Sequence, residues 1–282
     1  MQIWRISVII LYIVMAVAVL IAVYCRMLKT NSKRAEKMVP FEKVYIAHRG
    51  AHNLVIPENS LRAFQRAIEA GNGIEIDVRL TKDGIPVVIH DNSLKRVCGV
   101  NEKVSELNYD KLKEYCLSGS DQSIPSLQEV LALVNGRVPI IIEIKIKFNC
   151  HMTCVKVSEM LKNYKGIYCI QSFYASVLIW FRKNCPEVLR GQLTSDMWGR
   201  GISKGKIASG LTTGMLNNWR TQPDFIAYCH KDAGRWVYKL CRVLYNPVCA
   251  GWTIRSEKEL EKAQKEFNII IYDNIYLNGL KD

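Results

Sequence analysis

Two carboxylates interrupt a stretch that otherwise predicts buried strands, "GIEIDVRLTKDGIPVVIHD" at residues 73–91. Side chains alternate between the two faces of a strand, so Glu75 and Asp77 share one face and the apolar residues share the other. Acids on a half-exposed strand would give the same alternation and need no function. Which interpretation holds therefore depends on the other polar residues that the fold brings to this strand.

The end of the same stretch carries an imidazole. The connection at residues 81–84 contains Gly84 and is too short for a parallel crossover, so it predicts an antiparallel hairpin. Folding the hairpin about the midpoint of residues 82 and 83 places His90 opposite Glu75. Two carboxylates and one histidine would then meet at one place.

Further polar residues follow or interrupt other predicted strands. His48 and Arg49 follow the apolar run at residues 44–47, and Glu143 and Lys145 break "IIIEIKI" with the same alternation. Three carboxylates suit a hard divalent cation such as Ca²⁺ or Mg²⁺. Two histidines can exchange protons near neutral pH, and the two basic side chains can hold an anion. Together these groups are suited to cleaving a phosphoester.

Strand-like runs mostly alternate with helical stretches from residue 44 onward, with about eight strands in all. The roughly 240 residues after the N-terminal segment match a TIM (β/α)8 barrel, which is typically about 250 residues. A doubly wound open sheet is the competing fold, but it favours a glycine-rich loop after its first strand. We therefore expect a barrel, whose active site lies at the C-terminal ends of the strands.

Net charge and cysteine content limit the classes of partner and the compartment that we expect. A net charge of +13 favours phosphate-bearing partners, but no basic and aromatic motif indicates nucleic acid, so none is expected. The 10 cysteines are scattered, which favours free thiols in a reducing compartment. Cys150 and Cys154 form only a weak metal pattern.

Nineteen residues without a charge, 6–24, match a transmembrane helix of about 20 residues. A cleaved signal peptide is the alternative, but its apolar region is shorter and precedes a small-residue cleavage site. We divide the chain into an anchor at residues 1–25, a basic juxtamembrane linker at 26–42 and a catalytic domain at 43–282. The basic linker favours a cytoplasmic domain, held near an anionic lipid surface.

With these residues placed, the sequence closely resembles the glycerophosphodiester phosphodiesterase family, as a membrane-anchored, bacterial-type member. The resemblance rests on these motifs: "AHRG" 47–50, "PENSLRAF" 57–64, residues 73–91, "IPSLQEVL" 124–131, "EIKI" 143–146, "QSF" 171–173 and "WTI" 252–254. The run at 73–91 is highly specific, whereas "QSF" alone would indicate nothing.

The resemblance implies a TIM barrel that uses one divalent cation to hydrolyse glycerophosphodiesters, and possible substrates include lysophospholipids. The products would be glycerol 3-phosphate, or lysophosphatidate, and an alcohol. By resemblance, His48 and His90 are the acid and base; Glu75, Asp77 and Glu143 are metal ligands; Arg49 and Lys145 contact phosphate. Trp252 is either a wall of the substrate pocket or an ordinary core aromatic. Asn59 is either part of the family signature or a helix cap.

Two departures from the family pattern are visible, Arg255 in place of the usual asparagine and the ending "IIYDNIY" at 270–276. Both are expected to lie away from the catalytic set. His52, His151 and His230 are expected to be structural or surface residues. Two other functions stay open: a lyase of the phosphatidylinositol-specific phospholipase C type, and a catalytically silent, membrane-tethered phosphate-binding module.

Overall fold

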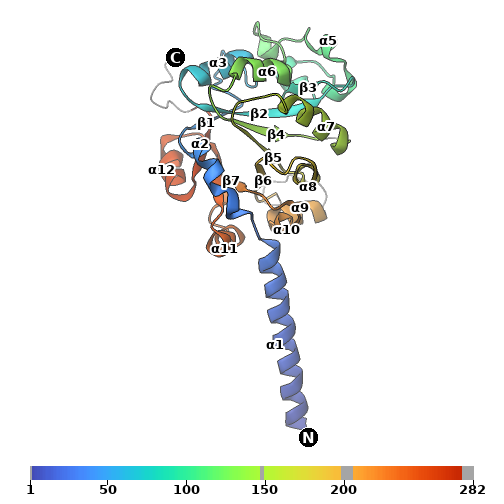
Figure 1. The fold of residues 1–282 in the computed structure, drawn as a ribbon, viewed down its shortest axis with the longest axis vertical. Coiled ribbons are helices and arrows are strands. Elements are labelled where there is room, and N and C mark those ends of the chain that lie inside the picture. The colour runs from blue at the N-terminus through green and yellow to red at the C-terminus, as the bar shows by residue number, and fades with distance from the viewer. Residues whose placement is uncertain (1, 147–148, 198–205, 275–282) are drawn as a thin grey trace.

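The computed structural model describes residues 2–146, 149–197 and 206–274, and it contains a closed barrel of parallel strands (Figure 1). Eight of its nine strands are parallel neighbours in the order β1-β9-β8-β7-β6-β5-β4-β2, and pairing of β1 with β2 closes the ring. The strands are β1 (Ile46–His48), β2 (Gly73–Leu80), β3 (Pro86–Val88), β4 (Ile140–Ile144), β5 (Tyr168–Ser172), β6 (Arg190–Thr194), β7 (Phe225–Cys229), β8 (Val248–Ile254) and β9 (Ile269–Tyr272). The predicted TIM barrel is confirmed.

Helices connect most of the strands and pack around the barrel. They are α3 (Leu61–Glu69), α6 (Leu127–Val134), α7 (Cys150–Leu161), α8 (Ala175–Asn184), α9 (Lys206–Thr213), α10 (Asn218–Thr221), α11 (Trp236–Tyr245) and α12 (Glu257–Glu266), with a short turn η4 (His230–Asp232) after β7. Several begin with a serine whose hydroxyl accepts a hydrogen bond from the first turn, as Ser60 does from the Ala63 amide at 3.1 Å.

The predicted hairpin is present, but its register differs from the expected one by one residue. Val78 pairs with Val88 and Leu80 with Pro86, and the Thr81 amide donates to the Ile85 carbonyl at 3.1 Å. The loop therefore holds three residues, 82–84, and not two. Gly84 adopts φ +81° in that loop, which a residue without a side chain tolerates best. His90 therefore does not lie opposite Glu75 as predicted. It leaves the hairpin beyond the last pair of β3.

Residues 92–123, which showed no clear periodicity in the sequence, form four short helical turns. These are α4 (Lys95–Cys98), η2 (Val104–Glu106), α5 (Tyr109–Leu112) and η3 (Leu117–Gly119). They enclose a small hydrophobic cluster separate from the barrel core, called here the insertion cluster: Val87, Ile89, Leu94, Val97, Val104, Leu112, Leu117 and Ile124. The insertion is thus a small packed unit beside the barrel mouth.

The N-terminal helix α1 (Gln2–Met27) projects away from the barrel (Figure 1). The most apolar 18-residue stretch of this helix has a mean hydropathy of 3.1, and none of it is buried against the rest of the protein. Among the described residues it is the one helix whose length and composition would allow it to cross a membrane. A signal sequence near the N-terminus would have the same properties.

Residues 32–42, within the segment predicted as a linker, form η1 (Ser32–Met38) and α2 (Val39–Glu42) and pack across the N-terminal ends of the strands. Met38 and Phe41 are fully buried there. Complete burial of one such side chain stabilises the fold by roughly 1.5–3 kcal/mol. Arg34 Nε also donates to Asp224 Oδ1 at 2.9 Å, and the carboxylate of Asp224 is fully buried. This segment closes the barrel floor.

Candidate active site

The first strand ends in a tight turn that sets the directions of His48 and Arg49. Arg49 adopts φ +59° and Gly50 adopts φ +81°. A side chain on Gly50 would place its Cβ 2.8 Å from Ala63, so only glycine fits between the turn and α3. The turn leaves His48 at the C-terminal end of β1, beside Glu75, its neighbour on β2 in the strand register.

Three buried carboxylates meet on two adjacent strands. Glu75 and Asp77 come from β2 and Glu143 from β4, whose register places Glu143 beside Asp77. One oxygen of each carboxylate lies within 4.8 Å of the others. The period-two spacing seen in the sequence is the reason, because it turns all three side chains to the same side of the two strands.

Two basic side chains hold the central carboxylate, Asp77. Arg49 Nε lies 3.2 Å from Asp77 Oδ2, and Lys145 Nζ lies 3.1 Å from Asp77 Oδ1 and 2.7 Å from Glu143 Oε1. Burial would raise the pKa of Asp77, but the charges of Lys145 and Arg49 outweigh burial and lower this pKa. Burial also disfavours the charged form of Lys145, yet Asp77 and Glu143 raise its pKa.

Glu75 has a different environment. Burial, and then the negative charges of Asp77 and Glu143, raise its pKa well above the usual value. Its Oε1 accepts a hydrogen bond from Gln171 Nε2 at 3.2 Å. A divalent cation in contact with the three carboxylates would remove this repulsion, and buried oxygen donors are what Ca²⁺ and Mg²⁺ prefer. The residues present therefore fit one hard cation.

His90 reaches the same place from the hairpin. β4 occupies one edge of β2, so β1 and β3 share the other edge, and His90 emerges just beyond the end of β1. Its Nδ1 lies 2.7 Å from Asp91 Oδ1, and Arg96 joins Asp91 to Glu58. The hydrogen bond to His90, and then that of Arg96, lower the pKa of Asp91. Ion pairs at the base of the insertion thus fix the ring.

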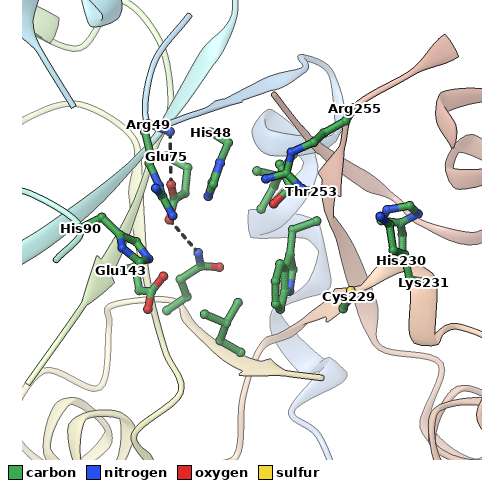
Figure 2. Close-up of a pocket in the computed structure, with 14 residues that line it drawn as sticks. His48, Arg49, Glu75, His90, Glu143, Cys229, His230, Lys231, Thr253 and Arg255 are labelled. Atoms are coloured by element: carbon green, nitrogen blue, oxygen red, sulfur yellow. Dashed lines mark hydrogen bonds between the residues drawn. The ribbon is translucent and has the colours of Figure 1, made fainter. Parts of the chain in front are cut away.

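Some of these groups line one cavity at the C-terminal end of the barrel, with a volume of about 190 Å³. Figure 2 shows His48, Arg49, Glu75, His90 and Glu143 on one side, with Arg255, His230 and Lys231 on the other. Asp77 and Lys145 do not line the cavity. They lie behind its wall, where Asp77 is paired with Arg49 and Lys145 with Glu143. Trp252 lines the cavity and also packs edge-on against Phe173, 5.8 Å between ring centroids, so both of its predicted roles have support in the geometry.

The C-terminal end of β9 contributes a carboxylate that sequence reasoning missed. Asp273 Oδ2 lies 3.8 Å from His48 Nδ1, and Asp273 Oδ1 lies 2.9 Å from His52 Nε2. Burial lowers the pKa of His48, and this carboxylate opposes the lowering. The signal available in the sequence was an acid directly after the last strand, the same position that His48 occupies after the first.

The expectation that Arg255 and the C-terminal stretch lie away from the catalytic set is wrong. Arg255 lines the cavity, and its Nε lies 3.0 Å from Asp273 Oδ2. Arg255 follows β8, which pairs with β9, and closure of the barrel places β9 beside β1 in turn. Residues 275 and 276 of that stretch are outside the described part of the chain. His52 and His230, expected to be structural or surface residues, also belong to this region. His151 accepts a hydrogen bond from Trp180 on the outer helices.

Asn59 is not the cap of α3, as the sequence left possible. Ser60 caps that helix, and Asn59 donates from Nδ2 to Asp77 Oδ2 at 3.0 Å. Asn59 is buried and adopts φ +56°, which asparagine tolerates better than most residues. It therefore helps to orient one of the three carboxylates.

Comparison with known proteins agrees with this geometry. Residues 48–198 match the model of the glycerophosphoryl diester phosphodiesterase family. A glycerophosphodiester phosphodiesterase of Bacillus altitudinis is 35% identical over 163 residues, which are 54% of this chain and 66% of the relative. Human lysophospholipase D GDPD1 is 38% identical over 139 residues, 44% of this chain and 42% of the relative. The matches thus span about two fifths to two thirds of these relatives' lengths.

Solved structures share the fold. A glycerophosphodiester phosphodiesterase from Thermotoga maritima aligns with a TM-score of 0.64 and 29% identity over 81% of this chain and 94% of its own. A phosphodiesterase from Oleispira antarctica, solved in complex with sn-glycerol-3-phosphate, aligns with a TM-score of 0.68 over 82% and 92%. At 22% identity the latter shows the fold alone. Since the family model covers more than half of the sequence, the chain belongs to the glycerophosphoryl diester phosphodiesterase family.

Proposed function

We propose that the protein is a metal-dependent phosphodiesterase that hydrolyses glycerophosphodiesters to glycerol 3-phosphate and an alcohol. The observation that carries the proposal is the convergence of two histidines, three carboxylates and Arg49 at the mouth of one barrel. The names of the relatives support the substrate class, because they include glycerophosphodiester phosphodiesterases and a lysophospholipase D.

Glu75, Asp77 and Glu143 would hold the cation, either Ca²⁺ or Mg²⁺. A bound divalent cation supplies Lewis-acid stabilisation of the charge that develops on the phosphate. Lys145 and Arg49 keep Asp77 ionised, and Asn59 fixes its direction. The chain itself thereby keeps these donor oxygens charged and oriented.

The two histidines would move the protons. One takes a proton from the attacking nucleophile, which is either water or the adjacent glycerol hydroxyl, and the other donates a proton to the leaving alkoxide. Arg49 also lines the cavity, so its guanidinium is placed to contact a phosphate oxygen. Lys145 lies behind the cavity wall and pairs with Glu143, so it adds positive charge near the phosphate. Trp252 would form the wall against the organic part of the substrate.

The full chain in detergent, supplied with Ca²⁺ or Mg²⁺ and glycerophosphocholine, is expected to release glycerol 3-phosphate. Phosphorus NMR of the reaction identifies the product directly, and lysophosphatidylcholine tests whether lysophosphatidate is formed as well. A cyclic phosphate as the final product would favour the lyase alternative. Absence of turnover on every diester would favour a silent phosphate-binding module and contradict the proposal.

We also propose that α1 is a single-pass membrane anchor and that the barrel lies on the cytoplasmic side. Basic residues flank the barrel side of α1, whereas Arg5 alone flanks the other side of the apolar run. Positive charge near a helix end favours the cytoplasm. Arg34 is bound to Asp224, so Arg26, Lys29, Lys33 and Lys37 remain to face lipid. The free cysteines agree with a reducing compartment.

Cys116 offers a test of orientation, because it is an exposed thiol on the insertion. A membrane-impermeant thiol reagent is expected to leave the protein unlabelled in intact cells and to label it after lysis. Cys116→Ser should lower the signal after lysis, which identifies the labelled site. Strong Cys116-dependent labelling before lysis would place the barrel outside the cell.

A further inference from the structure

A second cavity lies at the junction of α1 with the barrel, remote from the active site. Its volume is about 320 Å³, and it shares no lining residue with the catalytic cavity. The walls come from the end of α1, the residues that follow it and α10. In Figure 1 this junction lies beside α10 and α11, on the side of the barrel opposite α5 and α6. The volume is within the range of small-ligand sites, about 300–1,000 Å³.

The lining is strongly basic. Arg26, Lys29 and Lys33 contribute to it, and no acidic residue does. Within the described ranges, none of these three has a carboxylate oxygen within 4.0 Å, whereas Arg34, directly after Lys33, is bound to Asp224. The cavity therefore carries an uncompensated positive charge, which suits a phosphate group.

A residue of the wall carries a buried hydroxyl that lacks a partner in the described part of the chain. Thr30 lines the cavity and is only 5% exposed. Its Oγ1 has no hydrogen-bond partner among the residues that the structure describes. A buried polar group without a partner is costly, and rotation of this hydroxyl toward a phosphate oxygen in the cavity would remove that cost. This observation is independent of the charge.

Aromatic residues indicate that the cavity lies at the level of the membrane–water interface. Trp219 on the cavity wall and Trp236 on α11 are 50% and 65% exposed, and Trp236 lies beside Tyr24 with ring centroids 5.6 Å apart. Tryptophan and tyrosine are enriched at membrane–water interfaces. They surround the point at which the apolar run of α1 ends and the basic residues begin.

The junction is also fixed in place. Asn218 Nδ2 donates to the Leu28 carbonyl at 3.2 Å, and the Tyr245 hydroxyl donates to the Cys25 carbonyl at 2.6 Å. Leu28 itself is fully buried. These contacts hold the cavity at a constant position relative to α1, and so to any lipid layer that α1 enters.

We propose that this cavity binds the phosphate of an anionic phospholipid in the leaflet that surrounds the C-terminal end of α1. The proposal rests on the membrane position of α1 proposed above. Arg26, Lys29 and Lys33 pair with the phosphate, Thr30 donates its hydroxyl, and Trp219 packs against the lipid glycerol region. A neutral lipid offers the same phosphate together with a compensating ammonium, so the site favours anionic headgroups.

Native mass spectrometry of the full chain, released from nanodiscs of mixed phosphatidylglycerol and phosphatidylcholine, tests the proposal. We expect one phosphatidylglycerol to be retained in preference to phosphatidylcholine. The triple variant R26Q/K29Q/K33Q should lower that preference by roughly a hundredfold, and Thr30→Val should weaken it.

A matched triple variant separates the site from general charge effects. K82Q/K95Q/K113Q removes the same charge from the hairpin loop and the insertion, and it should keep the lipid preference. Equal losses in the two triples, or no preference in the unaltered chain, would overturn the proposal. Full displacement of the lipid by excess inorganic phosphate would also overturn it, in favour of a free-phosphate site.

Two further measurements keep this proposal apart from those on which it depends. Flotation with neutral phosphatidylcholine vesicles reports anchoring by α1 alone. If the unaltered chain does not float, the proposed anchor is contradicted. Hydrolysis of glycerophosphocholine reports the catalytic cavity, and it should be equal in both triple variants. A protein that floats and hydrolyses but shows no lipid preference would contradict only the headgroup site.

Discussion

His48→Ala and His90→Ala are each expected to lower kcat by roughly 10²–10⁴, the usual contribution of a positioned acid or base. Both rings line the catalytic cavity, one from the end of β1 and the other from the residues after β3. Neither ring belongs to the hydrophobic clusters, so the barrel should still fold. Steady-state kinetics with glycerophosphocholine, together with circular dichroism, measure the two effects separately.

His151→Ala is the matched control, because His151 lies on α7 and contacts Trp180. It should leave kcat unchanged. A graded comparison is Asp273→Asn, which keeps the shape of the side chain near His48 but removes its charge. We expect a smaller loss in kcat than for His48→Ala, with little change in KM. Near-normal kcat in either histidine variant would remove that residue from the catalytic pair.

Glu75→Gln combined with Asp77→Asn is expected to lower activity by about 10³-fold or more. The reason is that Lewis-acid stabilisation by a bound cation is worth several kcal/mol, and about 1.4 kcal/mol corresponds to a factor of ten. Exhaustive chelation of the unaltered protein should have the same effect, and Ca²⁺ or Mg²⁺ should reverse it. Activity that survives both treatments would contradict the metal site.

A second readout does not depend on catalysis. Ligands that bind the folded state raise Tm, so the cation should raise Tm of the unaltered protein and leave that of the double variant unchanged. Asp110→Asn combined with Glu114→Gln removes two exposed carboxylates from the insertion and provides the control. That pair should keep both the activity and the cation-dependent shift in Tm.

The strand-borne part of the site could be predicted because alternation along a strand is a local property. Glu75 and Asp77 must share a face whatever the rest of the chain does, and Glu143 and Lys145 repeat the pattern on a second strand. Strands alternating with helices then limited the fold to a parallel sheet, and the length favoured a barrel. These inferences required no contact between distant residues.

Features that depend on long-range packing could not be predicted in this way. Asp273 reaches His48 because β9 closes against β1, and Arg255 reaches Asp273 because β8 pairs with β9. The role of Asn59 follows from its contact with Asp77, which lies 18 residues further along the chain. The position of His90 depended on whether the hairpin loop holds two residues or three, and a shift of one residue exchanges the faces of a strand.

The insertion cluster affects how the protein opens to solvent. Proteins open locally in cooperative units, and a small cluster with its own hydrophobic contacts forms such a unit beside a larger one. Amide hydrogens in the insertion are then expected to exchange through an opening of lower free energy than those of the central barrel strands, which hydrogen-exchange measurements would test. Ile89, adjacent to His90, belongs to this cluster, whereas Ala47, adjacent to His48, belongs to the barrel core. We therefore expect the two imidazoles to stand on separate cooperative units, so that local unfolding of the smaller unit would part them while the barrel stays intact.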